Sequence, residues 1–260
     1  MCFKNFAICM RKDSSLLKKI KADLHIHSCL SPCSDWDMSP KKVVQKSIER
    51  QLGLIAICDH NTAENVAATI REGDRQGVAV LPGMEVCSKE EVHLVTLFKG
   101  IKDALKMQEL IYANLNGENQ PDVFGHQVIA DEHDRVLGEN PRLLIGATGL
   151  SLNDIVAKVH QLGGICISSH VDRPSYSLIG QLGFIPADLH LDAVEVSYRV
   201  PLEKARAEIP GIGNYPCVTS SDAHFLHDIG RVWTEFLLAN PSLDELILAL
   251  AGKNGRRIIN

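Results

Sequence analysis

Short apolar runs alternate with longer segments of helical periodicity along most of this chain. The runs predicted to be buried strands are residues 53–58, 78–81, 92–98, 164–168, 193–196, 217–219 and 232–238. Helices are predicted over residues 103–116 and 151–162, and residues 39–40, 61–64 and 242–245 carry the signals of further helix starts. This strand–helix alternation, repeated about seven times, predicts a parallel sheet with helical crossovers.

The first predicted strand differs from the others, because every second side chain in it is polar. In residues 21–28, Leu24 and Ile26 alternate with Asp23, His25 and His27, a period of two that indicates a β-strand. Side chains at positions i and i+2 leave the same face of a strand roughly 6.5–7 Å apart. One face would present two imidazoles and a carboxylate, which suits a small metal ion. The other would pack against aliphatic side chains. The alternative is an ordinary strand with two solvated histidines.

More polar side chains follow directly after the apolar runs. The strand-end residues are His25, His27, His60, Glu85, His170, Asp222 and His224. In a barrel or an open α/β sheet, the carboxyl ends of parallel strands are where sites are assembled. His93 is the exception because it begins its strand, and a chain reversal after Glu85 would bring it to the same edge.

The residue types in this set favour a centre with more than one metal ion. Imidazoles and carboxylates without cysteine are typical of zinc, manganese or iron sites. Eight such groups exceed the needs of one tetrahedral ion, so we expect two or three divalent ions with Glu85 as a bridge. Two ions about 3.5–4 Å apart can clamp both oxygens of a phosphoryl displacement and lower the pKa of a bound water toward about 7.

Composition narrows the class of protein. The chain has 260 residues and a net charge of −5, which fits a single domain over residues 1–260 without an overall basic field for nucleic acid. Residues 116–149 are punctuated by Gly and Pro, and we expect an inserted flap or cap there. The eight cysteines form no CxxC pair, and residues 1–10 lack a signal-peptide cleavage site. No apolar run reaches the roughly 20 residues that span a bilayer. These features predict reduced thiols in a cytoplasmic protein.

Five motifs, taken in order, resemble those of the PHP family, named after polymerase and histidinol phosphatase. They are Asp23-Leu24-His25-Ile26-His27-Ser28, Cys58-Asp59-His60-Asn61, Gly83-Met84-Glu85 with His93 after it, Ser169-His170, and Ser221-Asp222-Ala223-His224. The resemblance implies a distorted (β/α)7 barrel with a di- or trinuclear metal centre at the carboxyl ends of the strands. It also implies hydrolysis of phosphate esters, mostly monoesters, with some members acting on nucleic-acid ends.

Carried over position by position, the resemblance assigns the ligands to three ions. His25, His27, Glu85 and Asp222 would bind the first, Glu85, His93 and His170 the second, and His60 with His224 the third. The chain departs from the family at the third site. The family places an aspartate shortly after the second histidine, whereas residues 30–33 hold no acidic residue here. Asp35 or Asp37 would have to complete this site, and Asp35 is favoured.

Two further residues are predicted to assist the reaction. Arg173 closely follows His170 and is placed to fork onto a substrate phosphate, the alternative being an ion pair with Asp172 or another carboxylate. Asp59 is predicted to orient a ligand histidine. Arg199 is a weaker phosphate-binding candidate. The histidines expected on the surface or on helices are His126, His133, His160, His190 and His227.

These inferences predict a metal-dependent phosphoesterase. It would hydrolyse a small phosphorylated metabolite, a nucleotide or a short oligonucleotide end with a metal-activated hydroxide, and long nucleic acid and membranes are disfavoured as partners. One alternative is an amidohydrolase-like hydrolase of C–N bonds, although no strand-end lysine stands out as a bridge. Another is a regulatory module with a degenerate metal site.

Overall fold

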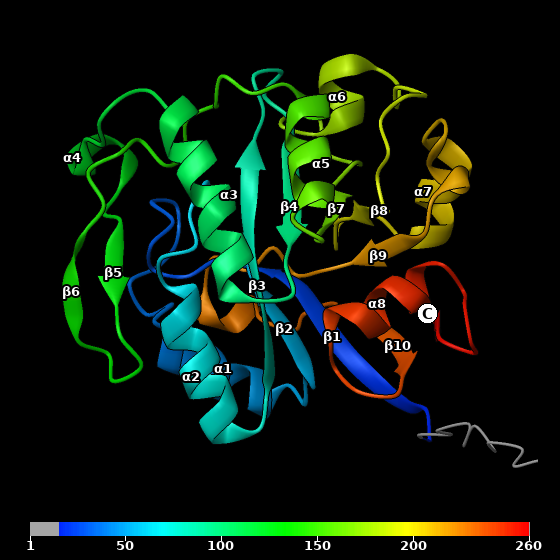
Figure 1. The fold of residues 1–260 in the computed structure, drawn as a ribbon, viewed down its shortest axis with the longest axis horizontal. Coiled ribbons are helices and arrows are strands. Elements are labelled where there is room, and N and C mark those ends of the chain that lie inside the picture. Colours follow the sequence, from blue (N-terminus) through cyan, green and yellow to red (C-terminus); the bar gives the residue numbers. More distant parts are fainter. Residues whose placement is uncertain (1–15, 260) are drawn as a thin grey trace, which may run out of the picture.

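The computed structural model describes residues 16–259 (Figure 1). Within them, one large sheet has the strand order β11-β10-β1-β2-β3-β4-β7-β8-β9. Its strands are β1 (Lys18–Ile26), β2 (Leu54–Ile57), β3 (Ala79–Cys87), β4 (His93–Leu97), β7 (Ile165–Ser168), β8 (Ala193–Val196), β9 (Cys217–Thr219), β10 (Thr234–Leu238) and β11 (Arg257–Ile258). The helices are α1 (Pro40–Glu49), α2 (Val66–Gln76), α3 (Ile101–Asn114), α5 (Leu152–Gln161), α6 (Leu178–Leu182), α7 (Leu202–Glu208) and α8 (Leu243–Leu250), with α4 in the inserted segment described below.

The two ends of this sheet come together, so that it forms a nearly closed barrel. The backbone amide of Thr219, at the end of β9, donates to Oγ1 of Thr234 in β10 at 2.8 Å. Just beyond β1, the amide of His27 donates to the carbonyl of Ala223 at 3.0 Å. The expected distorted (β/α)7 barrel is confirmed, and the segments that follow β1 and β9 lie side by side at its carboxyl edge.

Two strands depart from the parallel arrangement that the sequence predicts. β4 is antiparallel to both β3 and β7, with Cys87 opposite His93. β10 is antiparallel to β1 and β11. The reversal between β3 and β4 brings His93 to the edge where β3 ends, as expected from a turn after Glu85.

A β-bulge in β1 places Leu24 and Ile26 in different parts of the core. Asp23 pairs with Ile55 and Ile26 pairs with Ile57, so the register shifts between them. Leu24 packs in the inner cluster with α8, whereas Ile26 packs in the outer cluster beneath α1, α2, α3 and α5. The expectation that both side chains share one face was therefore wrong. Bulges at barrel rims re-aim side chains, and here the bulge lies at the strand end that carries His25.

Helix starts follow the sequence signals with one exception. The hydroxyls of Ser39, Ser151 and Ser242 accept N–H bonds at the starts of α1, α5 and α8. The capping box predicted at residues 61–64 was wrong, because α2 begins only at Val66 and Asn61 has a φ of 56°.

Residues 116–149 lie to one side of the barrel and add no strand to its sheet (Figure 1). They contain α4 (Pro121–Phe124) and the hairpin of β5 (Val128–Ala130) and β6 (Val136–Glu139). The amide of Val128 donates to the carbonyl of Cys29 at 3.0 Å, and the Asn65 side chain donates to the carbonyl of Val128 at 3.1 Å. The segment is thus attached to the loop that follows β1.

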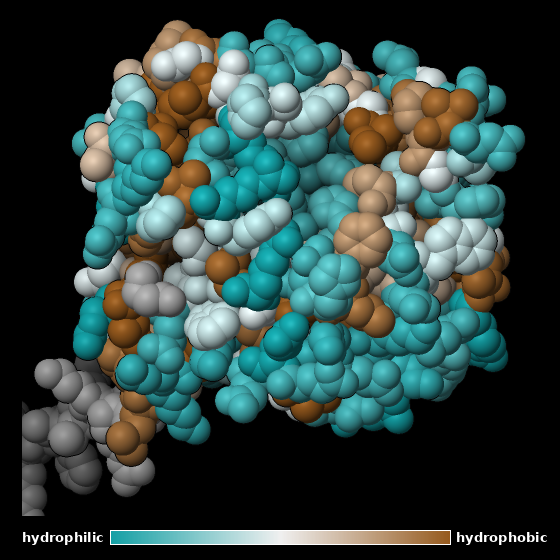
Figure 2. Space-filling view, turned by 180° about the vertical axis from the view of Figure 1, so that it is seen from behind, coloured by the Kyte–Doolittle hydropathy of each residue, from teal (hydrophilic) through white to brown (hydrophobic). Residues whose placement is uncertain are grey.

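The face of the molecule that Figure 2 shows is largely polar. On the face opposite to that of Figure 1, hydrophilic residues predominate and hydrophobic residues form small separate groups (Figure 2). In the part of the chain that the structure describes, no helix combines the length and apolar character needed to cross a membrane. Cysteines 29, 33, 58, 87, 166 and 217 are free thiols. Cys2, Cys9 and the segment weighed as a signal peptide lie outside the described residues.

Candidate metal centre

One buried carboxylate lies in the middle of the strand-end side chains. Glu85, on β3, is 1% exposed, and both of its oxygens face imidazoles. Oε1 lies 3.1 Å from His93 Nδ1 and 3.3 Å from both His25 Nε2 and His170 Nε2. Oε2 lies 3.2 Å from His60 Nδ1 and 3.5 Å from His27 Nε2. A carboxylate that contacts five imidazoles through two oxygens has the geometry of a bridging ligand.

Asp222 joins His25, in β1, and His27, just after it, in a second group. Nε2 of His25 and Nε2 of His27 are 3.2 Å apart. Oδ1 of Asp222 lies 3.5 Å from the first and 3.2 Å from the second. The candidate ligand atoms of these three residues all lie within 4.8 Å of one another. Side chains separated by almost two hundred positions therefore meet as the motif order predicts.

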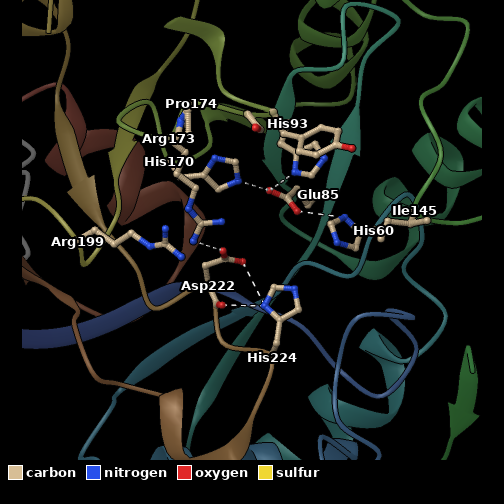
Figure 3. Close-up of a pocket in the computed structure, with 12 residues that line it drawn as sticks. His60, Glu85, His93, Ile145, His170, Arg173, Pro174, Arg199, Asp222 and His224 are labelled. Atoms are coloured by element: carbon tan, nitrogen blue, oxygen red, sulfur yellow. Dashed lines mark hydrogen bonds and ion pairs between the residues drawn. The ribbon is translucent and has the colours of Figure 1, made fainter. Parts of the chain in front are cut away.

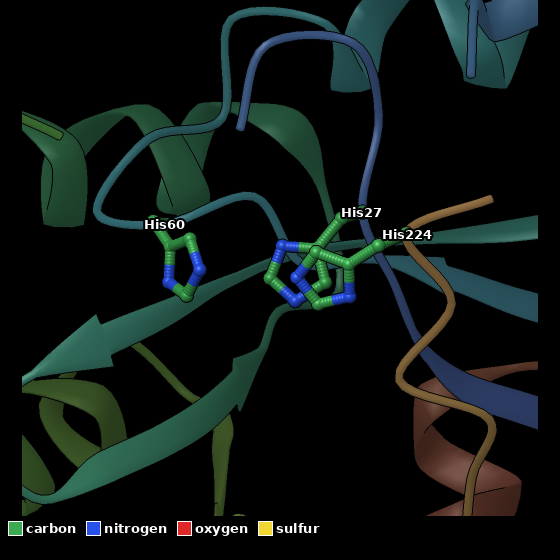
Figure 4. Close-up of side chains that lie close together, drawn as sticks. All are labelled: His27, His60 and His224. Carbon is green, nitrogen blue, oxygen red and sulfur yellow. The ribbon is translucent and has the colours of Figure 1, made fainter. Parts of the chain in front are cut away.

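A third group consists of imidazoles alone (Figure 4). His27, His60 and His224 come from three different loops, and the rings of His27 and His224 stack at 4.1 Å. Asp35 is not part of this group: it is exposed, and its carboxylate accepts the amide of Asp37 at 2.8 Å. Asp37 pairs instead with Lys42 at 2.6 Å. Among the described residues, neither aspartate belongs to a group of candidate ligands, and His27 lies beside His60 and His224 instead.

The residues present fit divalent cations. Oε1 of Glu85 and Nδ1 of His93 are buried without a hydrogen-bond partner in the described structure, although they face each other. Buried polar atoms are nearly always paired, so two such atoms require an explanation. Lone pairs on nitrogen and oxygen that face each other repel unless a proton or a cation lies between them. Imidazole and carboxylate are ligands of zinc, manganese and iron, which is consistent with the predicted centre.

Two further buried carboxylates lie behind the ligand histidines. Glu195, on β8, accepts the Nδ1–H of His25 at 3.1 Å and the amide of His170 at 3.2 Å. Asp59 accepts the hydroxyl of Ser31 at 2.7 Å, and that hydroxyl lies 2.9 Å from Nδ1 of His27. Such contacts fix the tautomer, so that Nε2 of each imidazole faces the centre.

Asp59 thus occupies an orienting position behind His27, and it does not line the cavity over the centre. Sequence reasoning missed Glu195 as a partner of His25. The signal was available, because Glu195 is a carboxylate inside the otherwise apolar run 193–196.

Burial and mutual attraction act in opposite directions on these groups. Burial lowers the pKa of His25, but Glu195, Glu85 and Asp222 outweigh it and raise that pKa well above its ordinary value. Burial and His224 lower the pKa of His27 to about 3. Burial raises the pKa of Glu85, yet the histidines around it hold that pKa well below its usual range. Neighbouring groups driven apart in pKa are typical of functional sites.

A cavity of about 330 Å³ opens over the centre, and arginines line one side of it (Figure 3). Arg173 pairs with Oδ2 of Asp222 at 2.6 Å, while its Nε is buried without a partner in the described structure. The ion pair weighed for Arg173 therefore forms, with Asp222 as its carboxylate. Asp172 instead accepts the amide of Ser197 at 2.7 Å. Arg199 also lines the cavity, whereas none of the five histidines expected elsewhere does.

A nearly closed α/β barrel with imidazoles and carboxylates at its strand ends defines a class of metal-dependent hydrolases. The PHP domain model matches residues 23–177, and the PHP-associated model matches residues 213–253, which include Asp222 and His224. The first match covers more than half of the chain, so the chain belongs to the PHP family. The predicted family is confirmed.

The individual proteins that resemble this chain share limited sequence identity with it. The 5'-3' exoribonuclease Rnm of Escherichia coli is 30% identical over 175 residues, which cover 63% of this chain and 56% of that protein. The matched segments span 29% of the length of the uncharacterized protein YqxK of Bacillus subtilis and 56% of the length of Rnm. The lesion-specific endonuclease PfuEndoQ of Pyrococcus furiosus superposes with a TM-score of 0.68 at 19% identity, over 93% of this chain and 58% of that chain. An amidohydrolase of Chromobacterium violaceum superposes with a TM-score of 0.58 at 19% identity, over 88% of this chain and 96% of that chain. At these identities the solved structures establish the fold.

Proposed function

We propose that this chain hydrolyses a terminal phosphate ester, of a small metabolite, a nucleotide or a nucleic-acid end, at a centre of two or three divalent ions. The observation that carries the proposal is the Glu85 carboxylate, surrounded by five imidazoles and placed beside the cavity that Arg173 and Arg199 line. A phosphate ester needs both features, because its charge must be neutralised and a water must be activated.

The proposed ligands follow the three groups. Glu85 is shared between a first set, with His25, His27 and Asp222, and a second set, with His93 and His170. His60 and His224 form a third set, which has His27 as its nearest further ligand. When bound, the ions supply positive charge at the phosphate and lower the pKa of a water. Glu195 and the Ser31–Asp59 pair hold the rings of His25 and His27 in place.

The arginines provide the specificity for phosphate. A guanidinium binds phosphate oxygens through two parallel N–H bonds, and it keeps its charge at any physiological pH. The contact with Asp222 orients Arg173, whose buried Nε–H still lacks an acceptor in the described structure. The cavity is near the lower end of the range of about 300–1,000 Å³ for ligand pockets, which suits one terminal unit.

A nucleic-acid end stays within the proposal despite the net charge of −5. Rnm is named as an exoribonuclease, and Endonuclease Q has been solved with a 27-mer duplex. These relatives weaken the expectation that long nucleic acid is disfavoured as a partner. The end of a nucleic-acid strand needs to place only one nucleotide in the cavity.

The test is release of the aryl leaving group by the metal-loaded protein from an aryl phosphate monoester, an aryl phosphate diester and an aryl amide of similar size. We expect release from the monoester, loss of it in Glu85→Gln, and loss of bound metal in the same variant. Glu72→Gln is the matched control, because Glu72 is a fully buried carboxylate on α2 that pairs with Arg75 far from the cavity lining. Unchanged turnover in Glu85→Gln would refute the proposal. Cleavage of the amide alone would favour the C–N hydrolase, and wild-type protein that binds no metal would favour the degenerate module.

A further inference from the structure

The side of the cavity across from the arginines has a different chemistry. Ile145 and Tyr176 line it, and neither side chain carries a charge. Figure 3 shows Ile145 beside His60, across the cavity from Arg199. A substrate whose phosphate binds the ions and arginines would therefore extend toward an aliphatic and aromatic wall.

Tyr176 presents one open ring face at this wall. Its ring stacks on the imidazole of His93, with centroids 4.8 Å apart and planes inclined by 26°. Its carbonyl accepts the amide of His93 at 2.9 Å. The residue is nevertheless 48% exposed. One side of the ring is thus supported by a candidate metal ligand, and the rest is available to a bound molecule.

The backbone at Tyr176 is held in an unfavourable conformation. Its φ is 56°, a left-handed value that is sterically costly for a bulky side chain. Three more non-glycine residues with positive φ lie in or next to the centre, namely Asn61, His170 and Asp222. Strain of this kind collects at sites where it places a side chain for function.

The loop around Tyr176 is rigid enough to hold that strain. The hydroxyl of Ser177 donates to the carbonyl of Arg173 at 2.5 Å and accepts the amide of Gly180 at 2.8 Å. Gly180 packs so close to Pro174 that an added Cβ would lie 2.5 Å from the Pro174 carbonyl oxygen. The ring of Tyr176 is therefore in place before a substrate binds.

Ile145 is held in place from the other direction by Asn61. The side-chain amide of Asn61 donates to the carbonyls of Leu144 and Gly146, both at 2.8 Å, one on each side of Ile145. The backbone amide of Asn61 donates to the carbonyl of Glu85 at 2.8 Å. The inserted segment thus brings an aliphatic side chain to the cavity through a residue bonded to the strand of the proposed bridging ligand.

We infer that Tyr176 and Ile145 form a subsite for a planar base next to the phosphate that is cleaved. The inference rests on the proposed function and names its substrate class: a nucleotide, free or at a nucleic-acid end, in preference to a sugar or polyol phosphate. Aromatic side chains stack on any nucleobase. The hydroxyls of a bare sugar would instead lose water against Ile145 and the ring of Tyr176 without gaining partners.

The test compares adenosine 5'-monophosphate with ribose 5-phosphate, which share the ester and the sugar and differ in the base. We expect kcat/KM to favour the nucleotide by about 10- to 100-fold. Tyr176→Ala should bring that ratio toward one, because it should lower kcat/KM for the nucleotide more than for ribose 5-phosphate. Tyr176→Phe should keep the ratio, and Tyr176→Leu should lose most of it, which separates stacking from apolar contact. Phe184→Ala is the control, because Phe184 is an exposed aromatic residue that does not line the cavity.

Binding measured by calorimetry keeps this test independent of turnover. Metal-loaded protein should bind adenosine monophosphate more tightly than ribose 5-phosphate, again by an amount that Tyr176→Ala removes. Equal turnover and equal binding of the two compounds would overturn the inference and leave the proposed function standing. An equal loss for both in Tyr176→Ala would also overturn it, since Tyr176 would then act only on His93. Preferential nucleotide binding without phosphate release would support the base subsite and refute the proposed function.

Discussion

The metal centre and the apolar wall of the cavity are built in opposite ways. The centre consists of buried side chains at strand ends, and further buried groups such as Glu195 and Asp59 hold them in place. The wall consists of Tyr176, on a strained loop, and Ile145, on an inserted segment, and hydrogen bonds to the backbone of each segment hold them. The strands of the barrel themselves position the centre, whereas the wall belongs to a loop and an inserted segment that are attached to the barrel.

This difference separates chemistry from selectivity. Every substrate needs the centre, so damage to it should lower the turnover of all substrates together. In the proposed function, the wall contacts only the part of a substrate beyond the phosphate, so changes there should alter the ratio between substrates. Loops on a rigid scaffold commonly carry selectivity in this way.

Metal removal should have the largest effect. Dialysis against a chelator should reduce phosphate release to the background rate, because the imidazoles and carboxylates supply no Lewis acid of their own. Restored metal should also raise the melting temperature, since a ligand at 100 times its Kd stabilises the native state by about 2.7 kcal/mol. Calorimetric scans with and without zinc or manganese check this. A melting temperature that responds to metal in Glu85→Gln as it does in wild type would place the ions elsewhere.

Loss of the Glu195 carboxylate should have the next largest effect. In Glu195→Ala the Nδ1–H of His25 and the amide of His170 lose their common acceptor. Outer contacts of this kind contribute about 10- to 100-fold to metal affinity or activity. The metal affinity, measured by titration, and kcat on two unrelated phosphate esters should fall in parallel. Glu195→Gln should recover part of the loss. If the two esters respond differently, Glu195 contacts substrate and does not act through His25.

Substitutions of Arg173 should have a smaller effect on kcat/KM, and two of them distinguish the role of its charge from the role of its planar geometry. Arg173→Ala removes a charged hydrogen-bonding group, a contribution of about 1.5–3 kcal/mol, which corresponds to roughly 10- to 150-fold in kcat/KM. Arg173→Lys keeps the charge without the planar fork and should recover only part of this. The matched control is Arg71→Ala, because Arg71 pairs with Glu132 on the surface. Full activity in Arg173→Lys would mean that charge alone is needed.

The centre could be predicted from the sequence because strand ends are marked by the end of an apolar run. His60, Glu85 and His170 each follow such a run, and parallel strands bring their ends to one edge. The bulge in β1 and the reversal into β4 depend on pairing between distant strands, which no local pattern records. Asn61 is a second example of a tertiary effect that the local sequence does not record. Its pattern is that of a helix cap, but its side chain donates instead to the distant carbonyls of Leu144 and Gly146.

No sequence signal marked the wall of the cavity. Ile145 belongs to a segment without clear periodicity, and Tyr176 follows a ligand motif in a loop. The role of each depends on where the chain is held, which only the folded structure reveals. Asp35 illustrates the reverse case, because a reasonable position in the sequence did not place its carboxylate among the candidate ligands.

Substitutions of Asn61 should have the smallest effect on turnover. They test directly whether its hydrogen bonds hold the wall in place. Asn61→Gly keeps a residue that tolerates the φ of 56° and removes the bonds to Leu144, Gly146 and the amide of Cys87. Each bond contributes about 0.5–1.5 kcal/mol, so the denaturation midpoint should fall measurably. Asn61→Ala should be less stable still by about 1–2 kcal/mol, because alanine resists a left-handed backbone. In both variants we expect ribose 5-phosphate turnover close to wild type and a severalfold smaller preference for the nucleotide. If turnover of both compounds drops equally instead, Asn61 supports His60 and the centre, and the separation between the two regions fails at this residue.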